Sequence, residues 1–355
     1  MQYREASFGL ESQFLRPIPS LALIPGCKLT LHRHAAIDTR GPSTSGQGIQ
    51  PDSLRYSGFM ASPSMDSAVL LLTCPDQPGL VARVSTLLFE MGANILHADQ
   101  HQDHELGLFF MRVEWTASPS DATAAPALDA LCQEFRIRFA PLAASLSMHW
   151  QLRRTGHRPR IALFCSQYLH CAADLLERIR SGELSCEVAL ILSNHRTIEP
   201  LAGFYGIPFH CLPVTPQTRA EAESRQLALL SEAGVELILL ARYMQILSPE
   251  FVARYPSAII NVHHSFLPAF MGARPYHAAH ARGVKLIGAT SHYVTSALDD
   301  GPIIEQDVAR ISHRDQVEDL VARGRDLERV VLARAVSWHL QHRILEYGNK
   351  TVVFD

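Results

Sequence analysis

Polar side chains interrupt an apolar stretch of the chain at one place where their chemical types suit catalysis. Residues 259–264 have the sequence Ile-Ile-Asn-Val-His-His. Asn261 therefore brings an amide into an apolar run, and His263 and His264 follow with two imidazoles. Because side chains alternate along an extended strand, Asn261 and His263 point to the same side. An amide can donate to a developing oxyanion, and an imidazole can exchange a proton near neutral pH. An isolated Asn-x-His motif is more often a turn cap beside an ordinary histidine, so this pattern alone leaves both interpretations open.

A second segment adds a carboxylate. Residues 288–304 are typical of a strand, a polar loop and another strand, with Asp-Asp-Gly-Pro at residues 299–302. By itself, this tetrapeptide is typical of a solvated turn. Together with Asn261 and His263, however, Asp299 completes a set of amide, imidazole and carboxylate. No Ser or Cys in a strand-to-helix elbow accompanies the set as a nucleophile.

Four short apolar segments are the elements that would position these side chains. They are apolar at both odd and even positions, as strands buried on both faces are, and they cover residues 161–165, 188–192, 237–241 and 258–262. Helical patterns lie near residues 170–181, 197–206, 218–234, 249–254 and 315–345. This alternation predicts an α/β fold with a doubly wound, mostly parallel, Rossmann-like sheet. Ligands bind at the carboxyl ends of strands in such sheets, which is where Asn261 and His263 lie.

The preceding region has a different pattern. Extended segments at 68–73, 94–102 and 108–115 and near 146–150 alternate with helical segments at 78–91 and 120–135. Along 108–115 the apolar residues share one face, while Arg112 and Glu114 take the other, which predicts a half-exposed strand. The order βαββαβ predicts a ferredoxin-like antiparallel sheet with helices on one face.

The length of 355 residues suits two domains and an additional segment. Residues 1–65 lack a sustained strand or helix period and are rich in Pro, Gly and Ser, so we expect an irregular, disordered leader. Acidic residues argue against a transit peptide, and a start codon assigned upstream of Met60 or Met65 explains the leader at least as well. The predicted domains then cover residues 66–150 and 157–355.

Composition restricts the partners and the compartment. A formal net charge of −3 gives no bias toward nucleic acid, and no apolar run is long enough for a membrane span. The seven cysteines are scattered without a Cys-x-x-Cys pair, so neither a disulfide framework nor a zinc site is indicated. We therefore expect a cytoplasmic protein with reduced thiols.

The two polar segments together resemble a known catalytic signature. Asn261-Val262-His263 with Ser265, followed by the Asp-Asp-Gly-Pro loop, resembles enzymes that handle the formyl group of 10-formyltetrahydrofolate. The longer run 260–277, residues 73–80 and the Tyr-Gly-Asn at 347–349 are similar to the formyltetrahydrofolate deformylase family, over residues 66–355. The resemblance implies an ACT domain followed by a formyltransferase-like catalytic domain.

The implied activity is hydrolysis of 10-formyltetrahydrofolate to tetrahydrofolate and formate, which would supply formate for purine synthesis and balance one-carbon folate pools. Formyl transfer to an amine acceptor, and a catalytically weak folate or amino-acid sensor, are the alternatives. Related glycinamide ribonucleotide transformylases carry a Gly/Ser/Asn-rich phosphate-binding turn after the first strand. The turn at residues 164–169 contains no glycine here, which favours water as the acceptor.

The resemblance also implies roles for individual residues. Asn261, His263 and Asp299 match the catalytic Asn, His and Asp of the family. The folate would contact Met244, Gln245, Ile246, Leu247, Val252, His264, Thr295 and Ser296. For His264 a supporting or substrate-binding role and a structural role are both open, and Gln245 stands where an Arg is common. We expect no cofactor beyond the folate substrate and no metal, since adjacent His263 and His264 diverge on a strand.

The ACT-like region suggests regulation. Asp76, Gly79 and Asn94 are the candidate effector-binding residues, and family precedent suggests methionine or glycine as the effector. An element that serves oligomerisation alone is an equally good interpretation, because a fold does not define a function. In either case we expect a homo-oligomer.

Overall fold

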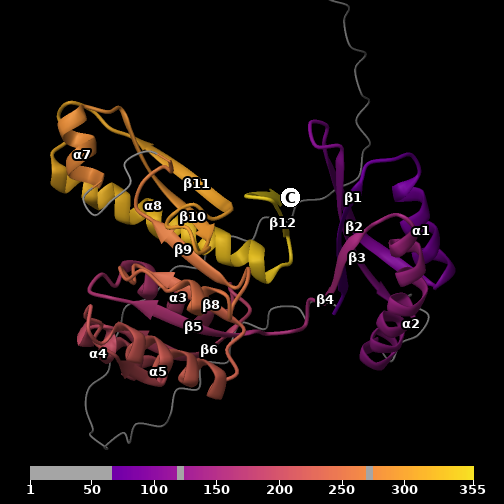
Figure 1. The fold of residues 1–355 in the computed structure, drawn as a ribbon, viewed down its shortest axis with the longest axis horizontal. Helices are drawn as coiled ribbons and strands as arrows, with labels where there is room; N and C mark the ends of the chain where they lie inside the picture. The colour runs from indigo at the N-terminus through magenta and orange to yellow at the C-terminus, as the bar shows by residue number, and fades with distance from the viewer. Residues whose placement is uncertain (1–65, 118–123, 269–274) are drawn as a thin grey trace, which may run out of the picture. The chain divides into compact units, whose positions relative to one another are not determined.

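Two sheets of different construction follow one another along the chain (Figure 1). The computed structural model describes residues 66–117, 124–268 and 275–355. The predicted leader, residues 1–65, lies outside the described residues, as do residues 269–274 of the family-like run.

The first sheet has the predicted βαββαβ order. Its elements are β1 (Ala68–Pro75), α1 (Leu80–Glu90), β2 (Ala93–Asp103), β3 (Leu108–Ala117), α2 (Ala124–Ser145) and β4 (His149–Arg154). The strands are antiparallel in the order β2-β3-β1-β4. Helices α1 and α2 both cover one face (Figure 1), where Trp115, Phe135 and Phe139 form an aromatic core. This apolar face explains why every second residue of β3 is buried against the helices.

The boundary between α2 and β4 differs from the prediction. The helix continues to Ser145, about ten residues beyond the expected end, because Phe139 and Ala143 extend the stripe of Phe135 at intervals of four residues. Leu146 and Met148 are buried in the turn that follows the helix, so their alternation does not mark a strand.

The opposite face of this sheet is covered, so the prediction of a half-exposed β3 is wrong. Val69, Leu71 and Phe110 pack against Phe354, next to the C-terminal hairpin. That hairpin pairs β12 (Ile344–Tyr347) with β13 (Lys350–Val353) in antiparallel register. Arg112, on the same face as Phe110, is only 5% exposed.

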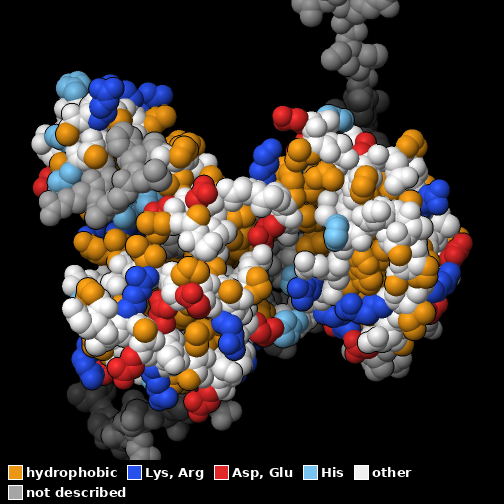
Figure 2. Space-filling view, in the orientation of Figure 1, with side chains coloured by type: hydrophobic (Ala, Val, Ile, Leu, Met, Phe, Trp, Pro, Cys, Tyr) orange, Lys and Arg blue, Asp and Glu red, His pale blue; other side chains and the backbone are white. Residues whose placement is uncertain are grey.

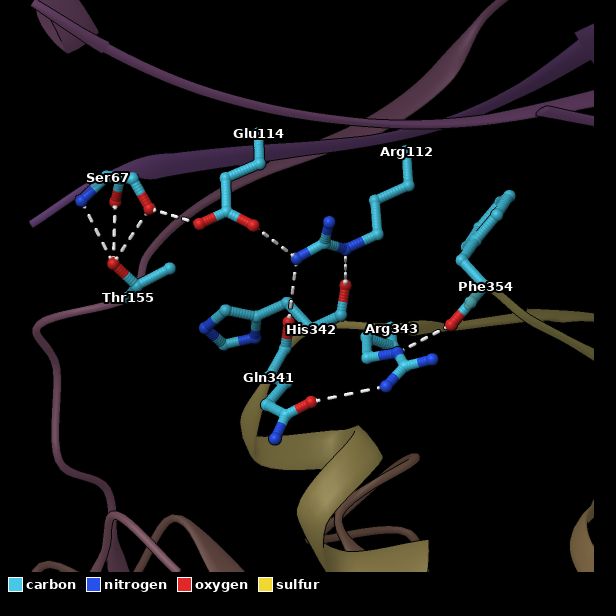
Figure 3. Close-up of polar contacts among 8 residues, drawn as sticks. All are labelled: Ser67, Arg112, Glu114, Thr155, Gln341, His342, Arg343 and Phe354. Atoms are coloured by element: carbon cyan, nitrogen blue, oxygen red, sulfur yellow. Dashed lines mark hydrogen bonds and ion pairs between the residues drawn. The ribbon is translucent and has the colours of Figure 1, made fainter. Parts of the chain in front are cut away.

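Arg112 is buried because it binds the end of the last helix, α8 (Val317–Leu340). Its Nε donates to the carbonyl of His342 at 3.0 Å, its Nη2 donates to that of Gln341 at 3.2 Å, and Glu114 pairs with it at 2.9 Å (Figure 3). Carbonyl groups at a helix C-terminus lack partners within the helix, and a cation there also interacts favourably with the helix dipole. The guanidinium therefore joins β3 to the C-terminal segment.

The second sheet has seven strands in the order β11-β10-β9-β8-β5-β6-β7. Its strands are β5 (Arg160–Cys165), β6 (Glu187–Ser193), β7 (Phe209–Cys211), β8 (Leu237–Ala241), β9 (Ile259–His263), β10 (Leu286–Tyr293) and β11 (Ile303–Arg310). Strands β5 to β9 are parallel, whereas β10 is antiparallel to both neighbours. The prediction of a doubly wound, mostly parallel sheet is confirmed.

Helices cover both faces of this sheet. They are α3 (His170–Arg180), α4 (Glu199–Tyr205), α5 (Arg219–Glu232), α6 (Pro249–Val252), α7 (Pro275–Arg282) and α8. Alternate residues of β5 point to opposite faces: Leu163 packs in one core with residues of α3 and α8, and Phe164 in another with residues of α5 and α6. Burial on both sides is the reason why these strands are apolar at every position.

The described surface agrees with the modest net charge. Acidic and basic side chains are interspersed over the visible face (Figure 2). Among the described residues, no helix has the length and apolar character needed to cross a bilayer. Six cysteines in the described ranges are free thiols.

Candidate active site

The pairing of β9 with β10 brings an amide and an imidazole together. Asn261 lies directly opposite His292, and His263 lies opposite Thr290. The Nδ2 of Asn261 is 3.2 Å from Nε2 of His292. Because Nδ1 of His292 lies 2.9 Å from the carbonyl of Tyr293, Nδ1 is the nitrogen that carries the proton and Nε2 accepts from Asn261. His292 thereby determines which way the Asn261 amide faces, a role that the sequence analysis missed.

Asp299 approaches the same two imidazoles from the loop after β10. Its Oδ2 is 3.3 Å from Nδ1 of His263, and its Oδ1 is 3.9 Å from Nε2 of His292. The loop returns closely over β10: a Cβ at Gly301 would lie 1.8 Å from the carbonyl oxygen of Tyr293. Only glycine fits this position, so Gly301 determines where Asp299 can lie.

The charges of the site follow from these contacts. The hydrogen bond with His263 outweighs burial and lowers the pKa of Asp299, which keeps this carboxylate ionised. Burial lowers the pKa of His292, so its neutral form is favoured. In His263, Nδ1 faces Asp299, while Nε2 is buried and has no hydrogen-bond partner among the described residues. Nε2 is thus the imidazole nitrogen of His263 that has no protein partner there.

These side chains open into a cavity of about 240 Å³. Of the predicted substrate-binding residues, those that line the cavity are Met244, Gln245, Ile246, Leu247, His264, Thr295 and Ser296. Val252 does not line it; this residue packs in the apolar core beside Phe251. The apolar side chains of Met244 and Ile246 are about half exposed, as expected for a surface that covers a flat aromatic ligand.

Unusual backbone conformations concentrate around this cavity. Arg242, Met244 and Asp299 have φ values of 63°, 58° and 53°, and they are three of the six non-glycine residues with positive φ in the described ranges. Such conformations cost on the order of 1 kcal/mol or more for residues with a side chain, and they cluster at functional sites. The loop after β8 and the loop after β10 are thus both held in unfavourable geometry at the cavity.

His264 reaches the cavity from the bend after β9. Its ring stacks on that of His263 with centroids 5.1 Å apart and planes 15° apart. Burial, with the nearby charge of Arg242, lowers the pKa of His264 to about 4. The bend is held by Thr290, whose hydroxyl accepts from the Leu267 amide and donates to the Ser265 carbonyl. His264 is therefore a neutral ring stacked on that of His263.

A buried polar cluster beside the cavity was not predicted. Glu328 of α8 is 1% exposed, and it contacts Nε2 of His170 at 2.7 Å, the hydroxyl of Tyr276 at 2.7 Å and Nη1 of Arg242 at 3.4 Å. Burial alone would raise the pKa of Glu328, but these partners together outweigh it and lower the pKa. One signal was present in the sequence: Glu328 continues the buried positions Leu320 and Gly324 at intervals of four residues.

The same cluster occupies the start of α3, directly after β5. The guanidinium carbon of Arg242 lies 5.1 Å from the centroid of the Tyr168 ring, and His170 is held by Glu328. The glycine-free turn at 164–169 is held by two neighbouring segments, since the Ser166 hydroxyl lies within hydrogen-bond distance of the Tyr243 carbonyl and of Oδ1 of Asn194. Side chains of Arg242 and Glu328 thus contact this strand-to-helix turn, the element that binds phosphate in many doubly wound sheets.

His170, Cys171 and Glu328 also form a group of potential metal ligands, with ligand atoms within 4.8 Å of one another. The His170 nitrogen and the Glu328 oxygen already bind each other. Burial strongly raises the pKa of the Cys171 thiol, which disfavours the thiolate that a metal requires. The donor chemistry therefore fits a hydrogen-bonded core better than a metal centre.

Of the three candidate effector residues, Asn94 lies apart from Asp76 within one chain. Gly79, with φ 88°, is the N-cap of α1, and Asp76 accepts a hydrogen bond from Gln102 near the end of β2. Asn94 is at the other end of this strand, eight residues or about 26 Å from Gln102 at the usual rise per residue. A single chain therefore does not bring Asp76 and Asn94 into a common site.

Comparison with known proteins identifies both sheets. The ACT domain family model matches residues 68–136, and the formyl transferase family model matches residues 159–336. The fold and the site thus define an ACT-domain protein with a formyltransferase catalytic fold. The chain is also 28% identical to glycinamide ribonucleotide transformylase 1 from Symbiobacterium toebii, with a TM-score of 0.53 over 58% of this chain and 97% of that one.

Similarity to one group of relatives is much more extensive. The chain is 53% identical to the formyltetrahydrofolate deformylase of Synechocystis sp. over 288 residues, which cover 81% of this chain and 98% of that protein. The crystal structure of a formyltetrahydrofolate deformylase from Pseudomonas syringae pv. tomato superposes with a TM-score of 0.77 at 44% identity, over 83% of this chain and 96% of that one. The chain belongs to the formyltetrahydrofolate deformylase family.

Proposed function

We propose that the protein hydrolyses 10-formyltetrahydrofolate to tetrahydrofolate and formate. The observation that carries the proposal is the convergence of the Asn261 amide, the His263 imidazole and the Asp299 carboxylate at the carboxyl end of β9, on the wall of a cavity. The reaction needs charge stabilisation on the formyl oxygen, removal of a proton from water, and delivery of a proton to the leaving nitrogen. Each need has a matching group in this set.

In the proposed mechanism, water attacks the formyl carbon and His263 takes its proton at Nε2. The ionised Asp299 holds Nδ1–H and stabilises the imidazolium that results. The amide of Asn261, oriented by His292, donates to the oxyanion, and one such donor contributes about 3 kcal/mol to a barrier reduction. His263 then returns the proton to the nitrogen as the carbon–nitrogen bond breaks.

The folate is proposed to lie along the loop after β8. Met244, Ile246 and Leu247 offer it apolar contacts, with Thr295 and Ser296 on the facing loop. Gln245 can donate or accept a hydrogen bond but carries no charge for a glutamate tail. His264 supports the catalytic ring by stacking, because its low pKa keeps it neutral at physiological pH.

Water is favoured over an amine acceptor because the strand-to-helix turn after β5 is filled. Tyr168 lies under Arg242, and His170 is bound to Glu328. A phosphorylated acceptor would have to displace this cluster. Asn261, His263 and Asp299 supply all the chemistry that the proposed reaction requires. We therefore propose that no metal or cofactor beyond the folate takes part.

We propose further that the enzyme acts in the cytoplasm, where its free thiols stay reduced, and that its formate supplies purine synthesis and balances the one-carbon pool.

The ACT domain would assemble the protein as a homo-oligomer. Support comes from β2, an exposed edge strand of eleven residues with Ile95 and Leu96 partly exposed, since unpaired edges readily pair with another chain. In such an assembly, Asn94 of one protomer could complete an effector site for methionine or glycine with Asp76 and Gly79 of another.

The test is to incubate the purified full chain with 10-formyltetrahydrofolate and to measure formate and tetrahydrofolate, with and without glycinamide ribonucleotide. Equal amounts of formate and tetrahydrofolate, unchanged by the amine, are expected. Formyl transfer to the amine would identify a transferase, and absence of turnover would favour the sensor alternative.

A further inference from the structure

Arg242, one of the residues that line the cavity, has a guanidinium edge without a partner among the described residues. Its Nη1 binds Glu328 at 3.4 Å, and this is the hydrogen bond that its guanidinium makes within the described residues. Its Nε is buried without a partner there, although the side chain is only 9% exposed. A buried donor without a partner costs about 1–3 kcal/mol, so a ligand that accepts from it would be bound favourably.

The position of this edge is defined by the contacts around it. Arg242 lines the same cavity as Asn261 and His263. Contacts also connect it to the catalytic ring, because His263 stacks on His264, and His264 lies beside Tyr276 with centroids 6.1 Å apart. Tyr276 binds Glu328, which binds Arg242. The charge of Arg242 in turn lowers the pKa of His264.

A guanidinium with Nη1 occupied offers its Nε–Nη2 edge, which matches the two oxygens of a carboxylate. Hydrolysis of a formyl amide creates one carboxylate: the water oxygen joins the formyl carbon, the carbon–nitrogen bond breaks with protonation of nitrogen, and the formic acid releases a proton. Formyl transfer to an amine would create a neutral amide and no anion. An arginine at this place therefore suits a hydrolase.

We infer that Arg242 forms a subsite for the formate product, with Glu328 as the residue that positions its guanidinium. The inference rests on the proposed function, because formate arises there only by hydrolysis. Tyr168 and Glu328 hold the guanidinium of Arg242 from two sides. The protein therefore fixes the orientation of the Nε–Nη2 edge before a ligand binds. The αL backbone at Arg242 is part of the same arrangement.

The test measures binding of ¹³C-labelled formate to the full chain by NMR line broadening, without folate, and inhibition of deformylation by added formate. Wild-type protein should broaden the formate signal saturably. Arg242→Gln should weaken formate binding about tenfold or more, as expected for loss of a charge-assisted bidentate contact. Formate inhibition should weaken by a similar factor.

Two further variants separate binding from folding. The double variant Arg242→Gln/Glu328→Gln removes both charges, so it does not leave a buried carboxylate unpaired, and it should also lose formate binding. Arg325→Gln is the matched control: this exposed arginine also lies over the Tyr168 ring, at 5.8 Å, but does not line the cavity. It should bind formate as the wild type does.

Formate binding that survives in both Arg242 variants would overturn the subsite, even if the wild type hydrolyses its substrate normally. Formate binding that is lost in both but retained in Arg325→Gln supports the subsite. A wild type that binds formate through Arg242 but has no deformylase activity would instead contradict the proposed function.

Discussion

At the scale of single residues, the site depends on which nitrogen or oxygen each side chain leaves free. Asp299 occupies Nδ1 of His263, and His292 occupies one N–H of Asn261. The remaining atoms, Nε2 of His263 and the other amide N–H of Asn261, are those that the proposed mechanism uses. A substitution that preserves shape but changes hydrogen bonding is therefore the most informative kind.

Replacing Asn261 with Ala should lower kcat by about two to three orders of magnitude with little change in KM, because its donor acts mainly on the oxyanion in the transition state. Steady-state deformylation measures both constants. Gln245→Ala is the control, since this residue also lines the cavity but has no assigned step, and it should change KM more than kcat. Full activity of Asn261→Ala would refute the oxyanion assignment.

Replacing Asp299 with Asn should also lower kcat by about two orders of magnitude or more, because a neutral amide does not stabilise the imidazolium of His263. The low pKa of Asp299 means that it stays ionised throughout the neutral range, so protonation of this carboxylate should reduce wild-type activity only well into the acid range. A pH–rate profile of the wild type checks this, and near-normal kcat in Asp299→Asn would exclude the role.

At the scale of elements, the catalytic set is assembled by the antiparallel pair of β9 and β10 and by the loop after β10. That Asn261 and His263 share one side of a strand was predictable, because side chains alternate along a strand. Strands β5, β8 and β9 were predictable because strands that are covered on both faces are apolar at both odd and even positions. The partners of Glu328 come from three distant segments, so no local period reveals them. The role of His292 likewise depends on the register between β9 and β10.

The close approach at Gly301 gives a prediction for the loop after β10. In Gly301→Ala the new Cβ would meet the Tyr293 carbonyl at 1.8 Å, so the loop must shift and Asp299 with it. We expect a loss of kcat of about tenfold or more, since small misplacements of catalytic groups are costly. Gly283→Ala is a control at an open position with positive φ, and it should affect stability more than kcat. Equal kcat in the two variants would show that the loop position is unimportant.

At the scale of the whole molecule, the C-terminal segment connects parts that the sequence pattern treats separately. It covers the second face of the β1–β4 sheet with Phe354 and supplies the carbonyls that Arg112 binds (Figure 3). Alternation along β3 correctly separated its two faces. The alternation did not show that a segment some 230 residues further along the chain covers the polar face of β3.

Arg112→Met should therefore destabilise the fold by about 2–3 kcal/mol, measured by urea unfolding, because the two carbonyls and Glu114 lose a charged partner.

Half-buried histidines make the stability of the molecule depend on pH. Burial lowers the pKa of His339 and His342 to about 4, below the ordinary value of 6.5. A depressed native pKa favours the folded state above pH 6.5, and this contribution is lost as the pH falls toward 4. Between about pH 7.5 and 5.5, each such histidine should cost about 1 kcal/mol of unfolding free energy.

Urea unfolding of the wild type at both pH values tests this expectation. His339→Gln keeps an amide near the Tyr293 hydroxyl, which lies 2.7 Å from Nδ1 of His339, but does not titrate. Between pH 7.5 and 5.5, the unfolding free energy of this variant should fall by about 1 kcal/mol less than that of the wild type. An identical dependence in wild type and variant would mean that His339 does not titrate on unfolding as proposed.

The central claim is that water, and not an amine, accepts the formyl group. The most direct measurement is single-turnover deformylation of 10-formyltetrahydrofolate in H₂¹⁸O, with mass analysis of the formate. The formate should carry one heavy oxygen from water and should appear together with an equal amount of tetrahydrofolate. Formate without heavy oxygen, or tetrahydrofolate that appears only when an amine acceptor is added, would contradict it.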